Sequence, residues 1–127
     1  MRWPRAEMQL RALESDAVRA LYELVGEDDE LFDELVVTFQ EDAPQRIVEL
    51  RRAVADGDTA LAARAAHTLK SNAATFGATE LASLCRRLEG AARAGELTGA
   101  SELIDHVEER WVLVRGDLAS LGQGAPG

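Results

Sequence analysis

Residues 58–77 read DTALAARAAHTLKSNAATFG, and this stretch decides the fold class because it has the pattern of one complete amphipathic helix. Asp58 is a suitable N-cap residue, and Gly77 is a suitable residue to end the helix. Between them, the residues of one helical face recur at intervals of four, four, three and four positions. They are Leu61, Ala65, Leu69, Asn72 and Phe76. The spacing predicts a helix that packs one face against a core.

The same periodicity continues on both sides of this stretch. It predicts a short helix over 15–25, a long helix from the acidic run 27–30 to Gly57, a helix from about Thr79 to Gly95, and a last helix over about 101–121. Pro44 lies inside the long helix and is expected to kink or divide it. Connections of a few residues require antiparallel neighbours. The sequence therefore predicts an all-α protein, an antiparallel up-down-up-down four-helix bundle with a short additional N-terminal helix.

Length and composition bound the domain organisation. A chain of 127 residues with 46% hydrophobic residues supports one domain over 1–121, with its core over about 15–121 and a disordered C-terminal tail over 122–127. Trp111 and the single cysteine, Cys85, are expected in the core. A lone cysteine fits a reducing compartment, and the sequence shows neither a long apolar run nor a signal-peptide pattern, so we expect a cytoplasmic protein.

The charge of the chain excludes several classes of partner. A formal net charge of −9 argues against nucleic acid and anionic membranes, which would repel it. The acidic run Glu27 to Glu30 lacks the spacing and central glycine of a calcium loop, so no metal site is predicted. The sequence also has no glycine-rich phosphate loop. We therefore expect no cofactor on this chain.

The outer face of the 58–77 helix is the candidate functional surface. His67 lies roughly 200° from the centre of the apolar stripe, so its ring is predicted to point at solvent. Segment 60–76 contains no acidic residue, although the protein is acidic. The neighbours of His67 on this face are small or cationic: Ala60, Ala63, Arg64, Lys70, Ser71 and Ala74. Small side chains would let a partner approach closely, and the cations could neutralise a phosphoryl group on the ring.

Three interpretations of this face remain open from the residues alone. In the first interpretation, His67 is a nucleophile, because an exposed imidazole is largely neutral near pH 7. It is alternatively an ordinary surface histidine on a face that docks a partner as a noncatalytic adaptor. An enzyme acting on a small molecule would need a concave polar pocket, which the apolar pattern does not indicate. The other histidine, His106, lies beside Asp105 and about 100° from the centre of the apolar seam of its helix, so it is expected at the boundary of that seam and is not expected to be functional.

The run Ala66-His67-Thr68-Leu69-Lys70-Ser71, continued to Gly77-Ala78, closely resembles the signature of bacterial histidine phosphotransfer domains. Segment 39–44, the Gly57-Asp58 break and the pattern Leu81, Cys85, Leu88-Glu89 are similar to the family's layout, so the resemblance covers about 15–120. It implies that His67 is the phosphorylated histidine, Lys70 the assisting cation, and Leu69 and Gly77 structural positions of the motif. Ser71 stands where the motif usually has glycine.

The resemblance implies a function as well as a fold. His67 would accept a phosphoryl group on Nε2 from a receiver-domain aspartate and pass it reversibly to another receiver domain. The chain would be a phosphocarrier without a kinase or ATP site, and its partners would be response-regulator receiver domains or a hybrid sensor histidine kinase, with magnesium on the receiver. We expect a monomer, because a monomeric bundle already accounts for the apolar stripes. Ser71 could donate a hydrogen bond to a phosphoryl oxygen, as Arg64 could support its charge. No carboxylate lies within one turn of His67 on its own helix.

Overall fold

The computed structural model describes residues 9–122, and the described part contains helices and no strand. Its elements are α1 (Ser15–Leu24), α2 (Asp29–Asp56), α3 (Thr59–Thr75), α4 (Thr79–Arg93) and α5 (Ala100–Gly122). The predicted all-α class is confirmed. Residue 122, which we expected in the tail, still belongs to α5, and residues 123–127 of that predicted tail lie outside the described residues.

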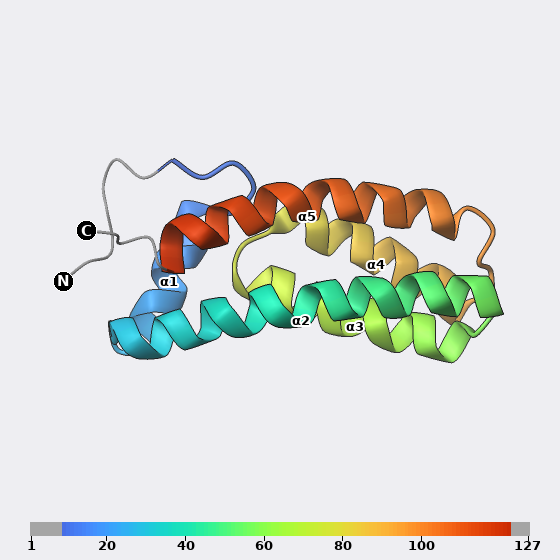
Figure 1. The fold of residues 1–127 in the computed structure, drawn as a ribbon, viewed down its shortest axis with the longest axis horizontal. Helices are drawn as coiled ribbons and strands as arrows, with labels where there is room; N and C mark the ends of the chain where they lie inside the picture. Colours follow the sequence, from blue (N-terminus) through green and yellow to red (C-terminus); the bar gives the residue numbers. More distant parts are fainter. Residues whose placement is uncertain (1–8, 123–127) are drawn as a thin grey trace.

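The four long helices are antiparallel to their neighbours in the chain, as the short connections predict (Figure 1). Helix α2 contacts α3 and α5, and α4 contacts the same two helices, so the four form a closed bundle. Helix α1 lies across one end, where it contacts α2 and α3. None of the described helices is both long and apolar enough to cross a membrane.

Local chemistry explains where the helices begin and end. Asp28 and Asp58 cap α2 and α3, because their Oδ1 atoms accept the backbone N–H of the third residue on, at 3.0 Å in both cases. Gly57 ends α2 in the left-handed conformation, with φ of 69°. Helix α2 continues through Pro44, so the expectation that this proline divides the helix into two pieces is wrong. Proline removes one backbone donor from a helix whose apolar face is otherwise continuous.

Aromatic rings join the elements at the end of the bundle that carries α1. The ring centroids of Tyr22 and Phe32 are 5.5 Å apart, and those of Phe39 and Phe76 are 5.2 Å apart and stacked. Phe39 also meets Trp111 edge-on at 5.3 Å. The predicted core position of Trp111 is thus confirmed, and the rings connect α1, α2, the end of α3 and α5.

Alanine side chains fill the space at the opposite end. Ala53, Ala62, Ala63 and Ala92 form a separate buried cluster between α2, α3 and α4. The predicted exposure of Ala63 on the docking face is therefore wrong, since only 7% of this residue is accessible. Helix α3 lies between two neighbours and buries an arc of roughly 160°, which is wider than the single stripe seen in the sequence.

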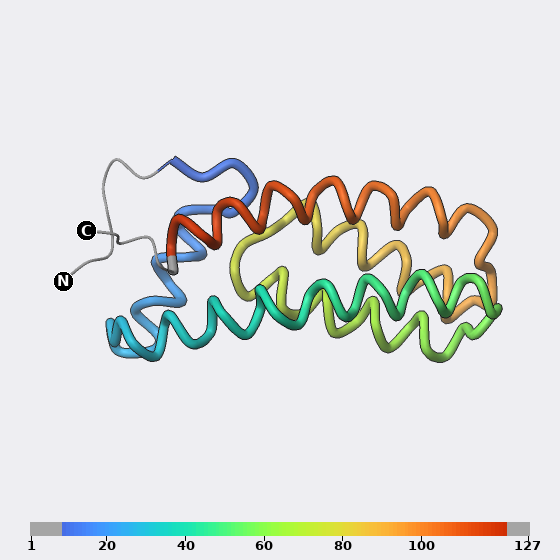
Figure 2. Tube along the Cα trace, viewed as in Figure 1, coloured from blue at the N-terminus to red at the C-terminus, as the bar shows by residue number. Residues whose placement is uncertain are grey.

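The chain before α1 is tied to α5 by one buried carboxylate. Asp117 accepts the backbone N–H groups of Arg11, Ala12 and Leu13 at 2.7–3.0 Å. Figure 2 shows this segment following α5 before the chain turns into α1. Three backbone donors that precede a helix are thereby satisfied inside the protein.

Gly77 is the point where the α3–α4 turn meets the start of α1. Its carbonyl accepts the N–H of Glu14 at 3.0 Å, and its φ is 73°. A Cβ at this position would lie 2.6 Å from the Cβ of Ala17. The glycine therefore provides a left-handed turn and also the space that α1 occupies.

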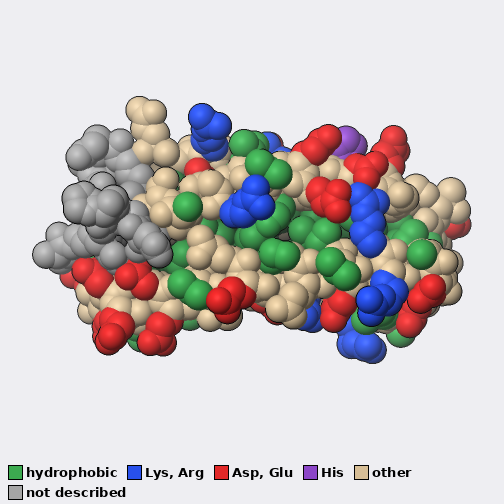
Figure 3. All heavy atoms as spheres, viewed as in Figure 1, with side chains coloured by type: hydrophobic (Ala, Val, Ile, Leu, Met, Phe, Trp, Pro, Cys, Tyr) green, Lys and Arg blue, Asp and Glu red, His purple; other side chains and the backbone are tan. Residues whose placement is uncertain are grey.

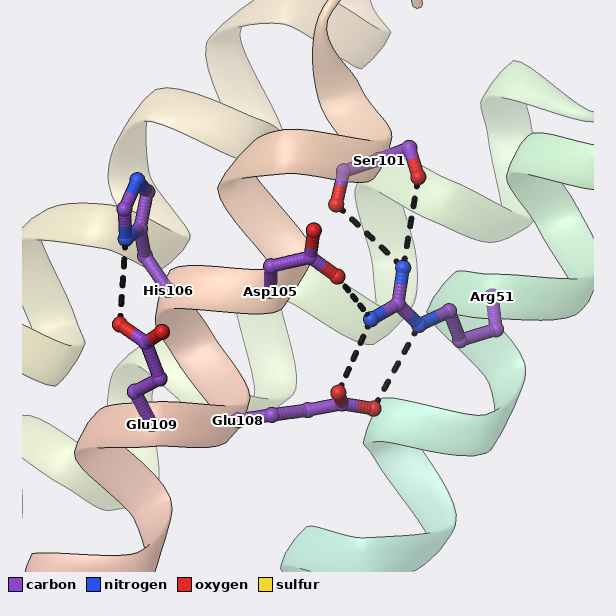
Figure 4. Close-up of polar contacts among 6 residues, drawn as sticks. All are labelled: Arg51, Ser101, Asp105, His106, Glu108 and Glu109. Carbon is purple, nitrogen blue, oxygen red and sulfur yellow. Dashed lines mark hydrogen bonds and ion pairs between the residues drawn. The ribbon is translucent and has the colours of Figure 1, made fainter.

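A polar network joins α2 to α5 on the surface (Figure 4). Arg51 of α2 pairs with Asp105 and Glu108 of α5, the latter at 2.9 Å, and its Nη1 donates to Ser101. These hydrogen bonds, that with Glu108 above all, raise the pKa of Arg51 above its usual value. Figure 3 shows hydrophobic side chains in a band between the two helices, with charged groups on either side. The network therefore joins α2 to α5 along the surface of their interface.

Candidate functional site

His67 lies near the middle of α3, and 55% of its side chain is accessible. The predicted exposure of the ring is thus confirmed. Its position is about 120° from the middle of the buried arc of α3, closer to the core than the apolar stripe alone suggested. The Nδ1 edge of the ring meets α4, and more than half of the side chain is accessible, which leaves the opposite edge towards solvent.

Glu89 of α4 is the group that the ring meets. Only 9% of its side chain is accessible, and its two oxygens accept from three neighbours. Oε2 lies 3.0 Å from Nδ1 of His67, and Oε1 accepts from Nζ of Lys70 at 2.6 Å. Nη2 and Nε of Arg93 donate to Oε2 at 2.7 and 3.1 Å. Two helices thus contribute to one network around a single carboxylate.

Lys70 and Arg93 keep this carboxylate ionised. Their hydrogen bonds, that of Lys70 first, lower the pKa of Glu89 from 4.5 to about 2, against the opposing effect of burial. An ionised carboxylate can only accept hydrogen bonds, so Nδ1 of the neutral His67 ring must carry the ring proton. The lone pair is then on Nε2, at the solvent-exposed edge of the ring.

This geometry prepares His67 for nucleophilic attack. Nε2 needs no base, because in this tautomer it carries no proton. The carboxylate on Nδ1 orients the ring and stabilises positive charge that develops on it when Nε2 forms a bond, the role a buried carboxylate plays for histidine in other sites. Lys70 lies three residues from His67 on the same helix and can meet a charge bound to the ring.

Glu89 and Arg93 are the members of the site that the sequence interpretation missed. We found no carboxylate within one turn of His67 because the partner comes from another helix, 22 residues later. A signal was present in α4, where Glu89 lies roughly 70° from the centre of a face formed by Leu81, Cys85, Leu88 and Ala92. An acidic side chain beside an apolar face needs a partner when it becomes buried.

The other predicted site residues on α3 differ in exposure and in their contacts. Arg64 and Ser71 are exposed, as are Ala60 and Ala74. Within the described part of the chain, Arg64 forms no ion pair and the Ser71 hydroxyl forms no hydrogen bond, so the structure does not bring either onto the ring. Leu69, by contrast, is fully buried, as its place in the motif implies.

The remaining candidates do not form a second site. His106 is exposed rather than at a boundary, and its Nδ1 lies 3.4 Å from Glu109 (Figure 4). Cys85 is buried as predicted, and burial raises the pKa of its thiol to about 12, so it remains protonated. Across residues 9–122, no cluster of three potential metal ligands occurs.

Comparisons with known proteins show the family to which the chain belongs. The family model described as the Hpt domain matches residues 34–123. The crystal structure of histidine-containing phosphotransfer protein B from Pseudomonas aeruginosa PAO1 superposes with a TM-score of 0.83 and 29% identity, covering 93% of this chain and 100% of the other. The curated proteins contain no significant sequence match. The family model spans well over half of the chain, which therefore belongs to the Hpt domain family, the histidine phosphotransfer proteins of phosphorelays.

Proposed function

We propose that His67 is the residue that carries the phosphoryl group in this protein. The observation that supports the assignment is the hydrogen bond from Nδ1 to Glu89, which leaves the lone pair of Nε2 at the exposed edge of the ring. The chain's other histidine, His106, has only a long contact with an exposed glutamate. His67 therefore has both the tautomer and the access that phosphoryl transfer requires.

In the proposed step, the Nε2 lone pair attacks the phosphorus of an aspartyl phosphate on a receiver domain. The new N–P bond forms as the P–O bond to the aspartate breaks, and the electron pair leaves on the aspartate carboxylate. Nδ1 keeps its proton, and Glu89 compensates the positive charge of the ring. The reverse step regenerates the aspartyl phosphate, so this chain supplies position and charge and does not need a base.

The partners that fit this step are receiver domains of response regulators or of hybrid sensor kinases. The exposed small residues Ala60, Ser71 and Ala74 leave space for such a domain against α3, with Arg64 and Lys70 beside the transferred group. Magnesium would be held by the receiver domain, and this chain would carry no cofactor, kinase or ATP site of its own. We propose that it works as a monomer in the cytoplasm, between a donor receiver and an acceptor receiver.

Phosphotransfer from a phosphorylated receiver domain tests the assignment. Wild-type protein should gain a phosphate that is labile in acid and stable in base. His67→Gln should gain none, whereas His106→Gln, which removes the other histidine, should be phosphorylated as wild type.

Equal labelling of wild type and His67→Gln would overturn the assignment of His67. Binding of a receiver domain without any transfer to the wild type would favour the adaptor instead, in which the same face docks a partner without chemistry.

A further inference from the structure

The two cations on Glu89 are placed differently, although both neutralise the same carboxylate. Arg93 donates through Nε and Nη2 to Oε2, the oxygen that also accepts from Nδ1 of His67. Lys70 is bound to the other oxygen, Oε1. Departure of Lys70 would therefore leave the contact between Glu89 and His67 in place.

Lys70 and Arg93 differ in how freely their side chains can leave Glu89. Lys70 shares α3 with His67, and its flexible stem can turn from Glu89 towards a group on the ring. Arg93 follows Glu89 by four residues on α4, and 62% of its side chain is accessible. Its planar guanidinium binds the carboxylate with two donors, which favours a fixed arrangement.

Burial makes the second cation necessary when a phosphoryl group arrives. Glu89 is nearly inaccessible, and an uncompensated charge at such a position is strongly unfavourable. In the described structure, the charged or titratable groups that contact Glu89 are Lys70 and His67 on α3 and Arg93 on its own helix. If Lys70 turns to the phosphoryl oxygens, Arg93 is the full positive charge that still holds the carboxylate.

We propose that Arg93 is a positioning residue for phosphoryl transfer, which holds Glu89 against Nδ1 of His67 while Lys70 turns to the phosphoryl group. This inference rests on the proposed function of His67. Arg93 acts through Glu89 and does not touch the reacting atoms. Once Lys70 is removed, the loss of Arg93 should therefore change the tautomer of the ring even before any phosphate is present.

Nitrogen-15 NMR of the imidazole rings, recorded on the unphosphorylated protein, tests this role. Lys70→Ala imitates the departure of Lys70 and should keep His67 in the single Nδ1–H tautomer. Lys70→Ala combined with Arg93→Gln should show a mixture of tautomers. Lys70→Ala combined with Arg86→Gln is the matched control, because Arg86 is an exposed arginine of α4 without an ion pair to the described residues. The control should resemble Lys70→Ala.

Transfer rates provide the second measurement. Arg93→Gln alone should slow phosphorylation by a phosphorylated receiver about threefold to tenfold, in keeping with the loss of part of a charge-assisted hydrogen bond. Arg86→Gln should remain within about twofold of wild type. Arg93→Lys should recover part of the rate, since it restores the charge but not the two-donor geometry.

The outcomes separate this inference from the proposed function. If the wild type is phosphorylated on His67 but the Arg93 variants match the Arg86 controls in tautomer and rate, only the role of Arg93 is overturned. Loss of the single tautomer in Lys70→Ala alone would also overturn it, because Arg93 would then be unable to hold Glu89 by itself. A wild type that accepts no phosphate would overturn the proposed function, and with it the inference.

Discussion

At Glu89, the ionisation of one carboxylate is coupled to folding. Its pKa falls from 4.5 to about 2 in the folded protein, which corresponds to at most about 3 kcal/mol of stabilisation. Because the folded-state pKa is the lower one, this stabilisation is complete above about pH 4.5 and is lost as the pH falls towards 2. Glu89→Gln should therefore lower the free energy of unfolding near pH 7 by up to about 3 kcal/mol, and the difference from wild type should shrink below pH 4.5. Urea denaturation at several pH values measures this gap, and a gap that is constant down to pH 2.5 would contradict the assignment.

Ser71 stands at the position where the family motif usually has glycine. Its hydroxyl is exposed and forms no hydrogen bond within the described residues. Ser71→Gly should leave the rate of phosphotransfer within about twofold of wild type and should destabilise α3 by only about 0.5 kcal/mol, the cost of glycine in a helix. Rapid-quench transfer assays and thermal unfolding measure the two effects. A rate loss of about tenfold would show instead that the hydroxyl supports the phosphoryl group.

At the scale of elements, the turn between α3 and α4 depends on the absence of a side chain at Gly77. Gly77→Ala should destabilise the protein by about 2–4 kcal/mol, because it adds a left-handed alanine and a Cβ that would lie 2.6 Å from that of Ala17. Gly57→Ala is the matched control, with a similar φ of 69° and open space around its Cβ. It should cost only about 1 kcal/mol. Equal losses in the two variants, measured by chemical denaturation, would show that α1 is not packed against the turn.

The helices themselves were predictable because each has its own local signals. Asp58 and Gly57 are recognisable at the level of single residues, and both perform the predicted role. The side of α3 on which Ala63 lies was not predictable, since a single stripe cannot show that a helix has neighbours on two sides. The partner of His67 was missed for the same reason: Glu89 reaches the ring only through the packing of α3 against α4.

At the scale of the whole molecule, the bundle closes where its first long helix meets its last. Arg51 makes this connection through partly exposed ion pairs, which are worth only about 1 kcal/mol even in a network. Arg51→Ala should lower the free energy of unfolding by about that amount, and the loss should diminish in 1 M salt. Its neighbour Arg52, exposed and unpaired among the described residues, provides the control and should change stability by less than 0.5 kcal/mol. Salt-independent destabilisation in Arg51→Ala would indicate lost packing rather than lost charge.

The hydrogen bond between Nδ1 of His67 and Glu89 has a consequence for detecting the modified protein. Phosphohistidine exists as two regioisomers, and a ring whose Nδ1 is occupied can be modified only on the other nitrogen. If His67 carries the phosphoryl group as proposed, the modified protein should therefore be the τ-phosphohistidine form. An antibody selective for that isomer would report the loaded state, whereas one selective for the π isomer would remain silent.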